Sequence, residues 1–168
     1  MRIIDPNFRR HVGRYVLQCL LATATVMVLL AVMDAVEHTV MVASLGASTF
    51  IVFTTPKAKE GSTRHLLGGY AVGIAVGTAF ALVHTWLTFQ KGSGAEQVAV
   101  VTFGGLAVGM AIFLMVVTNT EHPPAAGVAL GLVIGQNWNV TTLLGILGVI
   151  LGLALLKRML RRFLIDLL

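Results

Sequence analysis

The sequence predicts an all-α membrane protein with six transmembrane segments, and three observations support this fold class. Only 11% of the 168 residues are charged and 57% are hydrophobic, whereas a soluble domain carries roughly 25% charged residues. Several uncharged runs approach or exceed the ~20 residues that a helix needs to cross the hydrocarbon core. The basic residues gather between these runs and at the two ends. We therefore expect the lipid bilayer to be the first partner of this chain.

Six apolar segments follow from the positions of charged and helix-breaking residues. The first run is longer than the hydrophobic part of a signal peptide, so we interpret it as a retained span. The last run is too long for one helix, and the polar residues 136–139 divide it. The expected segments are Tyr15–Met33, Thr39–Pro56, Leu66–Gln90, Val98–Thr120, Pro123–Gly135 and Val140–Leu156. The second and fifth are short or broken, and the fifth would span only about 20 Å as a helix.

The basic residues favour a topology with both termini in the cytoplasm. Six crossings place every Lys and Arg except Lys91 on the cytoplasmic side, whereas four crossings would leave Lys57, Lys59 and Arg64 outside. We therefore expect a cytoplasmic basic N-terminus (1–14), a transmembrane domain (15–156) and a cytoplasmic basic amphipathic tail (157–168). The tail is expected to continue as an interfacial helix. A bacterial inner membrane is the expected location.

The two halves of the chain resemble each other weakly. An offset of 84 residues (121 minus 37) places Glu37-His38 on Glu121-His122 and the first span on the fourth. Three spans in each half would form an inverted 3+3 repeat, an architecture common in transporters. In such repeats, short or Gly/Pro-interrupted segments at matching places mark the binding site. The second and fifth segments meet that description.

Glycines at four-residue intervals predict tight contacts between helices. Glycine at this spacing gives a flat helix face that a neighbouring backbone can approach closely. The same faces would serve as contact surfaces between subunits, and we expect a homo-oligomer. The series are Gly69, Gly73 and Gly77; Gly127, Gly131 and Gly135; Gly105 and Gly109; and Gly148 and Gly152.

Two polar stretches form the candidate substrate pathway. Small residues permit unwound backbone, which is tolerated at membrane depth only beside protein or a wet cavity. Pro123-Pro124 must begin or interrupt a helix, whose positive N-terminal end would attract anions near His122. The pathway residues are Ser44, Gly46, Ala47, Ser48, Thr49, Asn119, Thr120, Glu121, His122, Pro123 and Pro124, and Glu37 and His38 mark an opposite mouth. His122 has two interpretations: it lines the route, or it satisfies backbone groups at a helix break.

The motif His122-Pro123-Pro124 after an Asn-Thr-rich helix end, with Ser44-Leu45-Gly46-Ala47-Ser48 upstream, resembles the HPP family of integral membrane proteins. The resemblance extends from Val40 to Leu156. It implies a transporter, because members are regarded as probable transporters, and plant and cyanobacterial relatives are linked to nitrite transport. It also implies four spans, against the six counted here. The chain departs from the family pattern at 56–61, where a proline-rich segment is expected, and at Ala126, where glycine is expected.

Transport of a small solute, expected to be an inorganic anion such as nitrite, is therefore the leading hypothesis. The alternatives are a non-transporting membrane subunit or scaffold and a membrane enzyme. The chain lacks the Gly-x-Ser-x-Gly elbow and the His-Glu-x-x-His zinc helix. We therefore expect no catalytic residue, no metal ion and no cofactor. The basic residues follow a membrane topology, so nucleic acid is not an expected partner.

Overall fold

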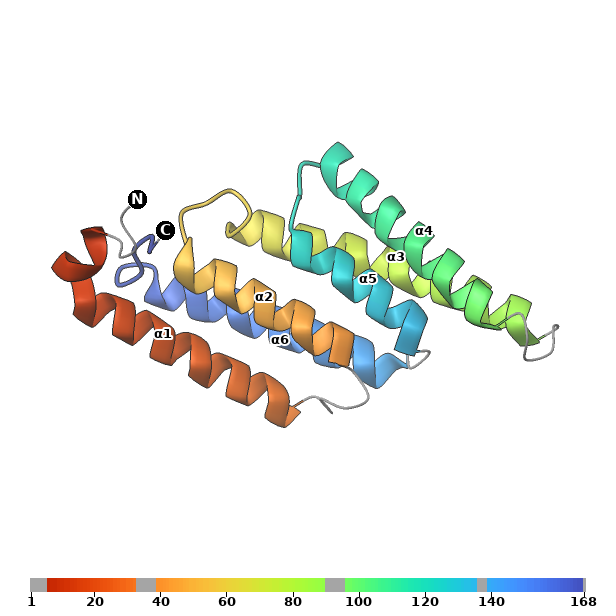
Figure 1. The fold of residues 1–168 in the computed structure, drawn as a ribbon, viewed down its shortest axis with the longest axis horizontal. Coiled ribbons are helices and arrows are strands. Elements are labelled where there is room, and N and C mark those ends of the chain that lie inside the picture. Colours follow the sequence, from red (N-terminus) through yellow and green to blue (C-terminus); the bar gives the residue numbers. More distant parts are fainter. Residues whose placement is uncertain (1–5, 33–38, 90–95, 136–138, 168) are drawn as a thin grey trace.

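The computed structural model describes residues 6–32, 39–89, 96–135 and 139–167, and within these ranges it contains six α-helices and no strand (Figure 1). The all-α fold class is therefore confirmed. The apolar part of each helix coincides with one predicted segment to within a few residues. The helices are α1 (Pro6–Val32), α2 (Thr39–Thr54), α3 (Thr63–Phe89), α4 (Glu96–Val117), α5 (Pro123–Gly135) and α6 (Val140–Leu160).

Four of these helices are long and apolar enough to cross a membrane. The qualifying stretches are His11–Val28, Thr63–Leu87, Val98–Val117 and Val140–Leu160, whereas α2 and α5 are shorter apolar helices. Figure 1 shows that each helix runs in the opposite direction to the one before it. Consequently the loop 55–62, the loop 118–122 and the segment 161–167 lie at one end of the bundle, here called the loop end.

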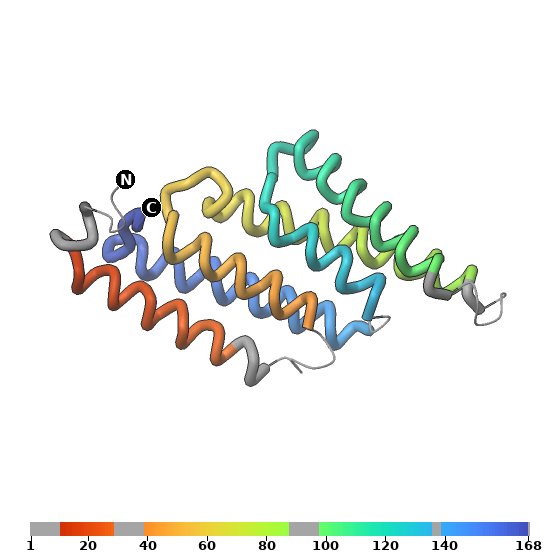
Figure 2. The backbone as a smooth tube through the Cα atoms, in the orientation of Figure 1, coloured from red at the N-terminus to blue at the C-terminus, as the bar shows by residue number. Residues whose placement is uncertain are grey.

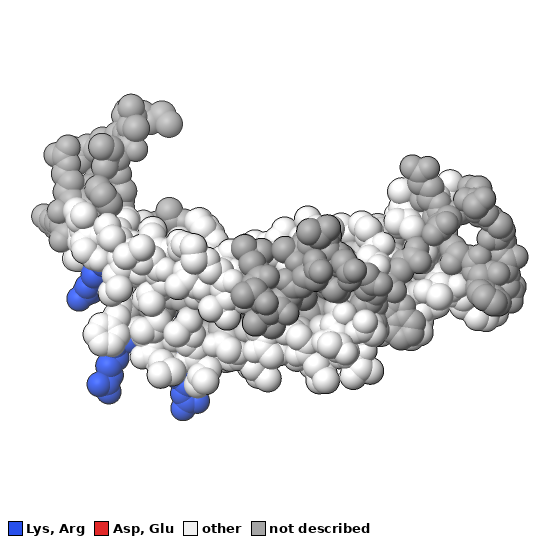
Figure 3. Space-filling model, turned by 90° about the horizontal axis from the view of Figure 1, so that it is seen from below, with Lys and Arg blue, Asp and Glu red and all other residues white. Residues whose placement is uncertain are grey.

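Hydrogen bonds hold the parts of the loop end together. The backbone N–H of Leu167 donates to the Thr54 carbonyl at 2.7 Å, and the Lys157 ammonium donates to the Pro56 carbonyl at 2.8 Å. The backbone trace in Figure 2 shows the same convergence of loops and C-terminal segment. On the face in Figure 3, the coloured Lys and Arg side chains lie toward one end, and the white surface extends beyond them. Many large hydrophobic side chains are exposed, among them Phe113 and Leu151. A charged end beside such an apolar surface is what a membrane-embedded bundle requires.

Helix α5 packs between α3 and α2 through small residues. A Cβ added at Gly77 would lie 2.7 Å from the Ala129 Cα, and one at Gly73 would meet the Ala125 carbonyl. On the other side of α5, a Cβ added at Gly131 would lie 2.6 Å from Cγ of Met41 in α2. These contacts confirm the close helix approach that the glycine spacing predicts.

The other glycine positions behave differently, and the prediction of tight contacts there is wrong within this chain. A Cβ added at any of them would meet nothing within 4 Å. They are Gly105, Gly109, Gly135, Gly148 and Gly152. Gly148 and Gly152 line an open groove between α1 and α6 rather than a tight contact.

Helix α2 is short, as predicted, but its backbone is unbroken through the Ser-Gly-Ala-Ser stretch. The Ser44 hydroxyl donates to the Val40 carbonyl at 2.9 Å, and the Thr49 hydroxyl donates to the Leu45 carbonyl at 3.0 Å. These bonds run back along the helix and keep the hydroxyls satisfied without unwinding it. The expectation of unwound backbone in this stretch is therefore wrong.

The expected helical continuation of the tail is also wrong. Helix α6 ends at Leu160, residues 161–163 form a turn, and the following residues are irregular. The buried amide of Gln18 accounts for this path: it donates to the Ile165 carbonyl at 2.9 Å and accepts from the Ile165 N–H at 3.2 Å. Leu164 and Leu167 are buried at the same place. A helix would leave these apolar side chains and this amide without their partners.

Candidate functional site

A helix cap at the end of α4 sets the position of the candidate site. Asn119 has φ of 52°, in the left-handed region. Its N–H donates to the Val116 carbonyl at 3.2 Å, and the Thr120 N–H donates to the Met115 carbonyl at 2.9 Å. This pair of bonds is the Schellman arrangement, in which asparagine is the usual substitute for glycine. The cap turns the chain sharply, so that His122 points back into the bundle.

The start of α5 follows directly from the two prolines. Pro123 and Pro124 occupy the first helical positions, where a missing N–H does not interrupt the helix. The first available N–H, that of Ala125, donates to the His122 carbonyl at 2.9 Å. Fewer N–H groups are therefore available for an anion at this helix end than the sequence analysis expected.

Three side chains from three different elements meet in the interior. His122 precedes α5, Ser48 lies in α2 and Tyr70 lies in α3, and their exposed fractions are 0%, 0% and 1%. The Ser48 Oγ lies 2.8 Å from the His122 Nε2 and 2.7 Å from the Tyr70 Oη. On the other side of the imidazole, Nδ1 lies 2.8 Å from the Glu60 carbonyl oxygen. We call Ser48, Tyr70 and His122 the polar core cluster.

The acceptors in this cluster determine the direction of its hydrogen bonds when His122 is neutral. A carbonyl oxygen can only accept, so the His122 Nδ1 carries the proton and donates to Glu60. The Nε2 is then an acceptor, and the Ser48 hydroxyl donates to it. The Tyr70 hydroxyl in turn donates to the Ser48 Oγ. Each of the three donors therefore has an acceptor, and the donations run in one direction, from Tyr70 to Ser48, to His122 and to the Glu60 carbonyl.

The cluster can also accommodate a protonated imidazole. Both ring nitrogens of His122 would then donate, and Ser48 would have to turn its own proton elsewhere. The Ser44 carbonyl, 3.2 Å from the Ser48 Oγ, is available as that acceptor. Burial lowers the pKa of His122 below its usual value, while the bond to the Glu60 carbonyl acts in the opposite direction. The neutral form is therefore favoured, and protonation reverses the Ser48 bond.

An ion-pair group lies beside this cluster at the loop end, where it joins the two loops to the start of α3. Glu121 Oε2 lies 3.1 Å from the Lys59 ammonium and 3.4 Å from the His65 Nε2. The pKa of Glu121 is lowered, first by the bond from its own backbone N–H and next by Lys59. Ser62 fixes the His65 ring through a 2.7 Å bond to Nδ1. The carboxylate is thus neutralised by a local partner.

The structure brings together only part of the predicted pathway. His122 meets Ser48 directly, and the Ser44 carbonyl lies beside them. Gly46 faces open space and Ala47 is exposed, so neither reaches the cluster. Thr49 is buried but bonds within its own helix. Glu37 and His38, the predicted opposite mouth, lie outside the described residues.

Sequence reasoning missed Tyr70 and the Glu60 carbonyl. Tyr70 stands in an apolar run without a neighbouring polar motif, and a backbone carbonyl has no signature in the sequence. One signal was present: Tyr70 follows Gly69, and a Cβ added at Gly69 would lie 2.6 Å from the His122 Cβ. Because Gly69 has no side chain, His122 can approach α3 closely next to Tyr70. Among the described residues, no group of three or more His, Cys, Asp or Glu side chains is placed to hold a metal ion.

The apolar helices, the charged loop end and the buried polar cluster define an integral, polytopic α-helical membrane protein. The family described as HPP, transmembrane region, matches residues 8–162, and the chain belongs to this family. A transmembrane protein of Dictyostelium discoideum is 34% identical over 103 residues, which are 59% of this chain and 32% of that protein. The chain therefore spans about a third of the length of that relative. No solved structure matches the chain.

Proposed function

We propose that the chain transports a small solute across the membrane, and that the polar core cluster takes part in the transport step. The observation that carries this proposal is the complete burial of His122 with hydrogen bonds at both ring nitrogens. Ionisable side chains within membrane bundles are costly, and they commonly mark solute or proton routes.

The depth of the cluster supports the proposal. At 1.5 Å rise per residue, Ser48 lies about 9 Å inside the end of α2 at Thr54, and Tyr70 lies about 10 Å inside the start of α3. The glycine contacts already bring α3 and α5 together, so polar groups are not needed to hold these helices in place. Their presence suits a route through the bundle better than a purely structural role.

The reversible hydrogen bonding of Ser48 suggests how a proton would take part. Protonation of His122 changes Ser48 from a donor to an acceptor toward the imidazole, and the Ser48 proton then turns to the Ser44 carbonyl of its own helix. The lowered pKa of His122 makes the neutral imidazole its resting form, and protonation belongs to the more acidic side of a pH gradient. Transport coupled to protons follows naturally from this geometry.

The solute is proposed by the family resemblance rather than by the site. Nitrite or another small inorganic anion is the substrate that the resemblance suggests. Lys59, the basic residue beside the cluster, pairs with Glu121 and does not form an open anion site by itself. We further propose a bacterial inner membrane with both termini in the cytoplasm, following the basic residues of the loop end.

Flux into liposomes that contain only this protein tests the proposal. The assay compares nitrite, nitrate, formate and chloride at about pH 8 and about pH 5, because burial lowers the pKa of His122 below its usual value of about 6.5. We expect Ser48→Ala and His122→Gln to lower the rate roughly tenfold, because one buried hydrogen bond contributes about 1–2 kcal/mol. Thr102→Val is the control, since this exposed hydroxyl bonds only the Val98 carbonyl of its own helix. Equal rates for all variants, or no flux of any solute with folded protein, would contradict the proposal.

A non-transporting membrane subunit is the second candidate, and one observation favours it. The glycine face of α4 is exposed, with nothing within 4 Å of an added Cβ at Gly105 or Gly109. Such faces suit contact with helices of another protein. Folded protein without flux would support this candidate. In both proposals the chain is not an enzyme.

A further inference from the structure

A basic cavity at the loop end lies apart from the polar core cluster. It has a volume of about 940 Å³ and lies between the α2–α3 loop and the end of α6. The side chains of Lys57, Lys157, Arg158 and Arg161 line it, together with apolar residues that include Leu155 and Leu164. The transport proposal uses none of these residues.

Positively charged side chains outnumber negatively charged ones around this cavity. Lys157 donates to the carbonyls of Pro56 and Gly61. Within the described ranges, no carboxylate lies within ion-pair distance of Lys57, Arg158 or Arg161. Asp166 is the nearby acid, and one of its oxygens accepts the Lys57 backbone N–H at 3.0 Å. Four cations and one carboxylate leave a net charge of +3 around the opening.

The helix dipole accounts for only part of this cluster. Lys157 and Arg158 lie in the last turn of α6, where basic residues interact favourably with the terminal carbonyls. Lys57 belongs to a different element and approaches from the loop after α2. Two elements therefore contribute charge to one opening, which a dipole effect does not require.

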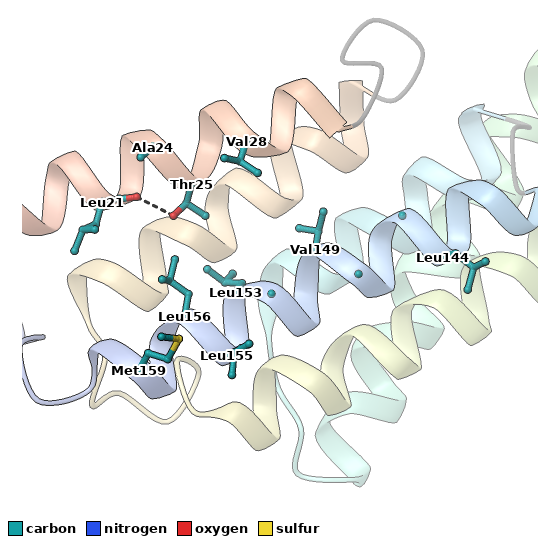
Figure 4. A pocket seen from close by; sticks show the side chains of 13 residues that line it. Leu21, Ala24, Thr25, Val28, Leu144, Val149, Leu153, Leu155, Leu156 and Met159 are labelled. Atoms are coloured by element: carbon teal, nitrogen blue, oxygen red, sulfur yellow. Dashed lines mark hydrogen bonds between the residues drawn. The ribbon is translucent and has the colours of Figure 1, made fainter.

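The apolar side of the cavity continues along α6. Leu155 lines the basic cavity and also a second, open groove of about 740 Å³ between α1 and α6. Figure 4 shows this groove, with Leu21, Ala24 and Val28 of α1 on one side and Leu153, Leu156 and Met159 of α6 on the other. Its one hydroxyl, that of Thr25, donates to the Leu21 carbonyl of its own helix. A cationic opening thus adjoins an apolar groove.

We propose that this cavity binds the phosphate-bearing headgroup of an anionic phospholipid, with an acyl chain passing Leu155 into the α1–α6 groove. A basic pocket at the end of transmembrane helices is suited to an anionic headgroup. The apolar continuation distinguishes a lipid from a soluble phosphate, which would gain nothing from the groove. The inference is independent of the transport proposal, because it involves other residues.

Lipid retention during purification tests this inference. Protein purified in mild detergent is exchanged into nanodiscs of phosphatidylcholine with or without phosphatidylglycerol, and bound lipid is measured by native mass spectrometry. We expect one phosphatidylglycerol to be retained preferentially. The double variant Arg158→Gln/Arg161→Gln should bind it roughly 25-fold more weakly, since each cation near a charged surface contributes about fivefold in affinity. Conversion of both arginines to lysine should preserve most of the binding.

The matched control removes the same charge from the same end of the bundle (Figure 1). Arg14→Gln/Arg162→Gln changes two exposed arginines that line neither cavity. An equal loss in this control would show diffuse surface attraction and overturn the proposal. Saturation by glycerol 3-phosphate with equal affinity would also overturn it, in favour of a soluble anion. Melting of each variant in phosphatidylcholine alone verifies folding. If the double variant unfolds there, the single variants Arg158→Gln and Arg161→Gln replace it, and each should bind phosphatidylglycerol about fivefold more weakly.

Discussion

The contact between α3 and α5 gives a quantitative test of the packing. Replacing Gly77 by alanine would put a Cβ 2.7 Å from the Ala129 Cα and 2.9 Å from its carbonyl oxygen. Carbon atoms in ordinary contact lie about 3.5–4.0 Å apart, so the helices would have to separate by about 1 Å. Overpacking of this kind costs about 1–3 kcal/mol. Alanine's better helix propensity, about 1 kcal/mol, offsets part of it.

Gly109→Ala is the matched comparison, because a Cβ there meets nothing within 4 Å. We expect Gly77→Ala to be destabilised by about 0–2 kcal/mol and Gly109→Ala to be stabilised by up to about 1 kcal/mol, so that the two differ by about 1–3 kcal/mol. Reversible unfolding in mixed detergent micelles, followed by circular dichroism, measures both under identical conditions. Two variants with the same unfolding midpoint would refute the inferred backbone contact.

Three further predictions follow from other contacts. Burial holds the pKa of folded His122 below its usual value, so the unfolded chain takes up the proton first as the pH falls. The stability that neutral His122 contributes is therefore present above about pH 6.5 and decreases below it. Thermal unfolding between about pH 7.5 and 5.5 should show this decrease, and His122→Gln should reduce it. Gln18→Leu leaves the backbone groups of Ile165 and the Phe53 carbonyl without their amide partner, which should lower stability by about 1–3 kcal/mol and speed proteolysis after α6; an unchanged cleavage rate would contradict the role given to this amide. A unique cysteine at Ala58 and another at 166, each in a chain with Cys19 replaced by serine, should be labelled from the same side of sealed vesicles, and labelling from opposite sides would exclude the common loop end.

Much of the helical architecture could be predicted, because charged residues and prolines mark where the helices begin and end. Pro123 begins α5 at the predicted residue, and Gly135 ends it there. The glycine spacing correctly predicted the face of α3 but not that of α4, since spacing says nothing about which side of a helix has a neighbour. Only the three-dimensional packing distinguishes Gly77 from Gly109.

The candidate site was predicted only in part, for a physical reason. His122 and Ser48 stand out as polar groups in an apolar sequence, and the structure places them 2.8 Å apart. Tyr70 is joined to them by long-range packing that no local pattern encodes. Asn119 and Thr120 appeared as polar pathway residues, yet their backbones form a helix cap. Composition identifies polar residues, but their backbone roles depend on local geometry.

The hydrogen bonds of Gln18 with the segment after α6 affect the order in which the bundle is assembled. Helix α1 is mostly exposed along its length, and its buried amide finds its partners in α2 and in Ile165. Ribosomes deliver the chain from the N-terminus, so the bond of Gln18 to the Phe53 carbonyl of α2 can form early, whereas its bonds to Ile165 form only after residues 164–167 have emerged. The contact of α1 with α6 therefore stays open to surrounding lipid until the segment after α6 has reached its place.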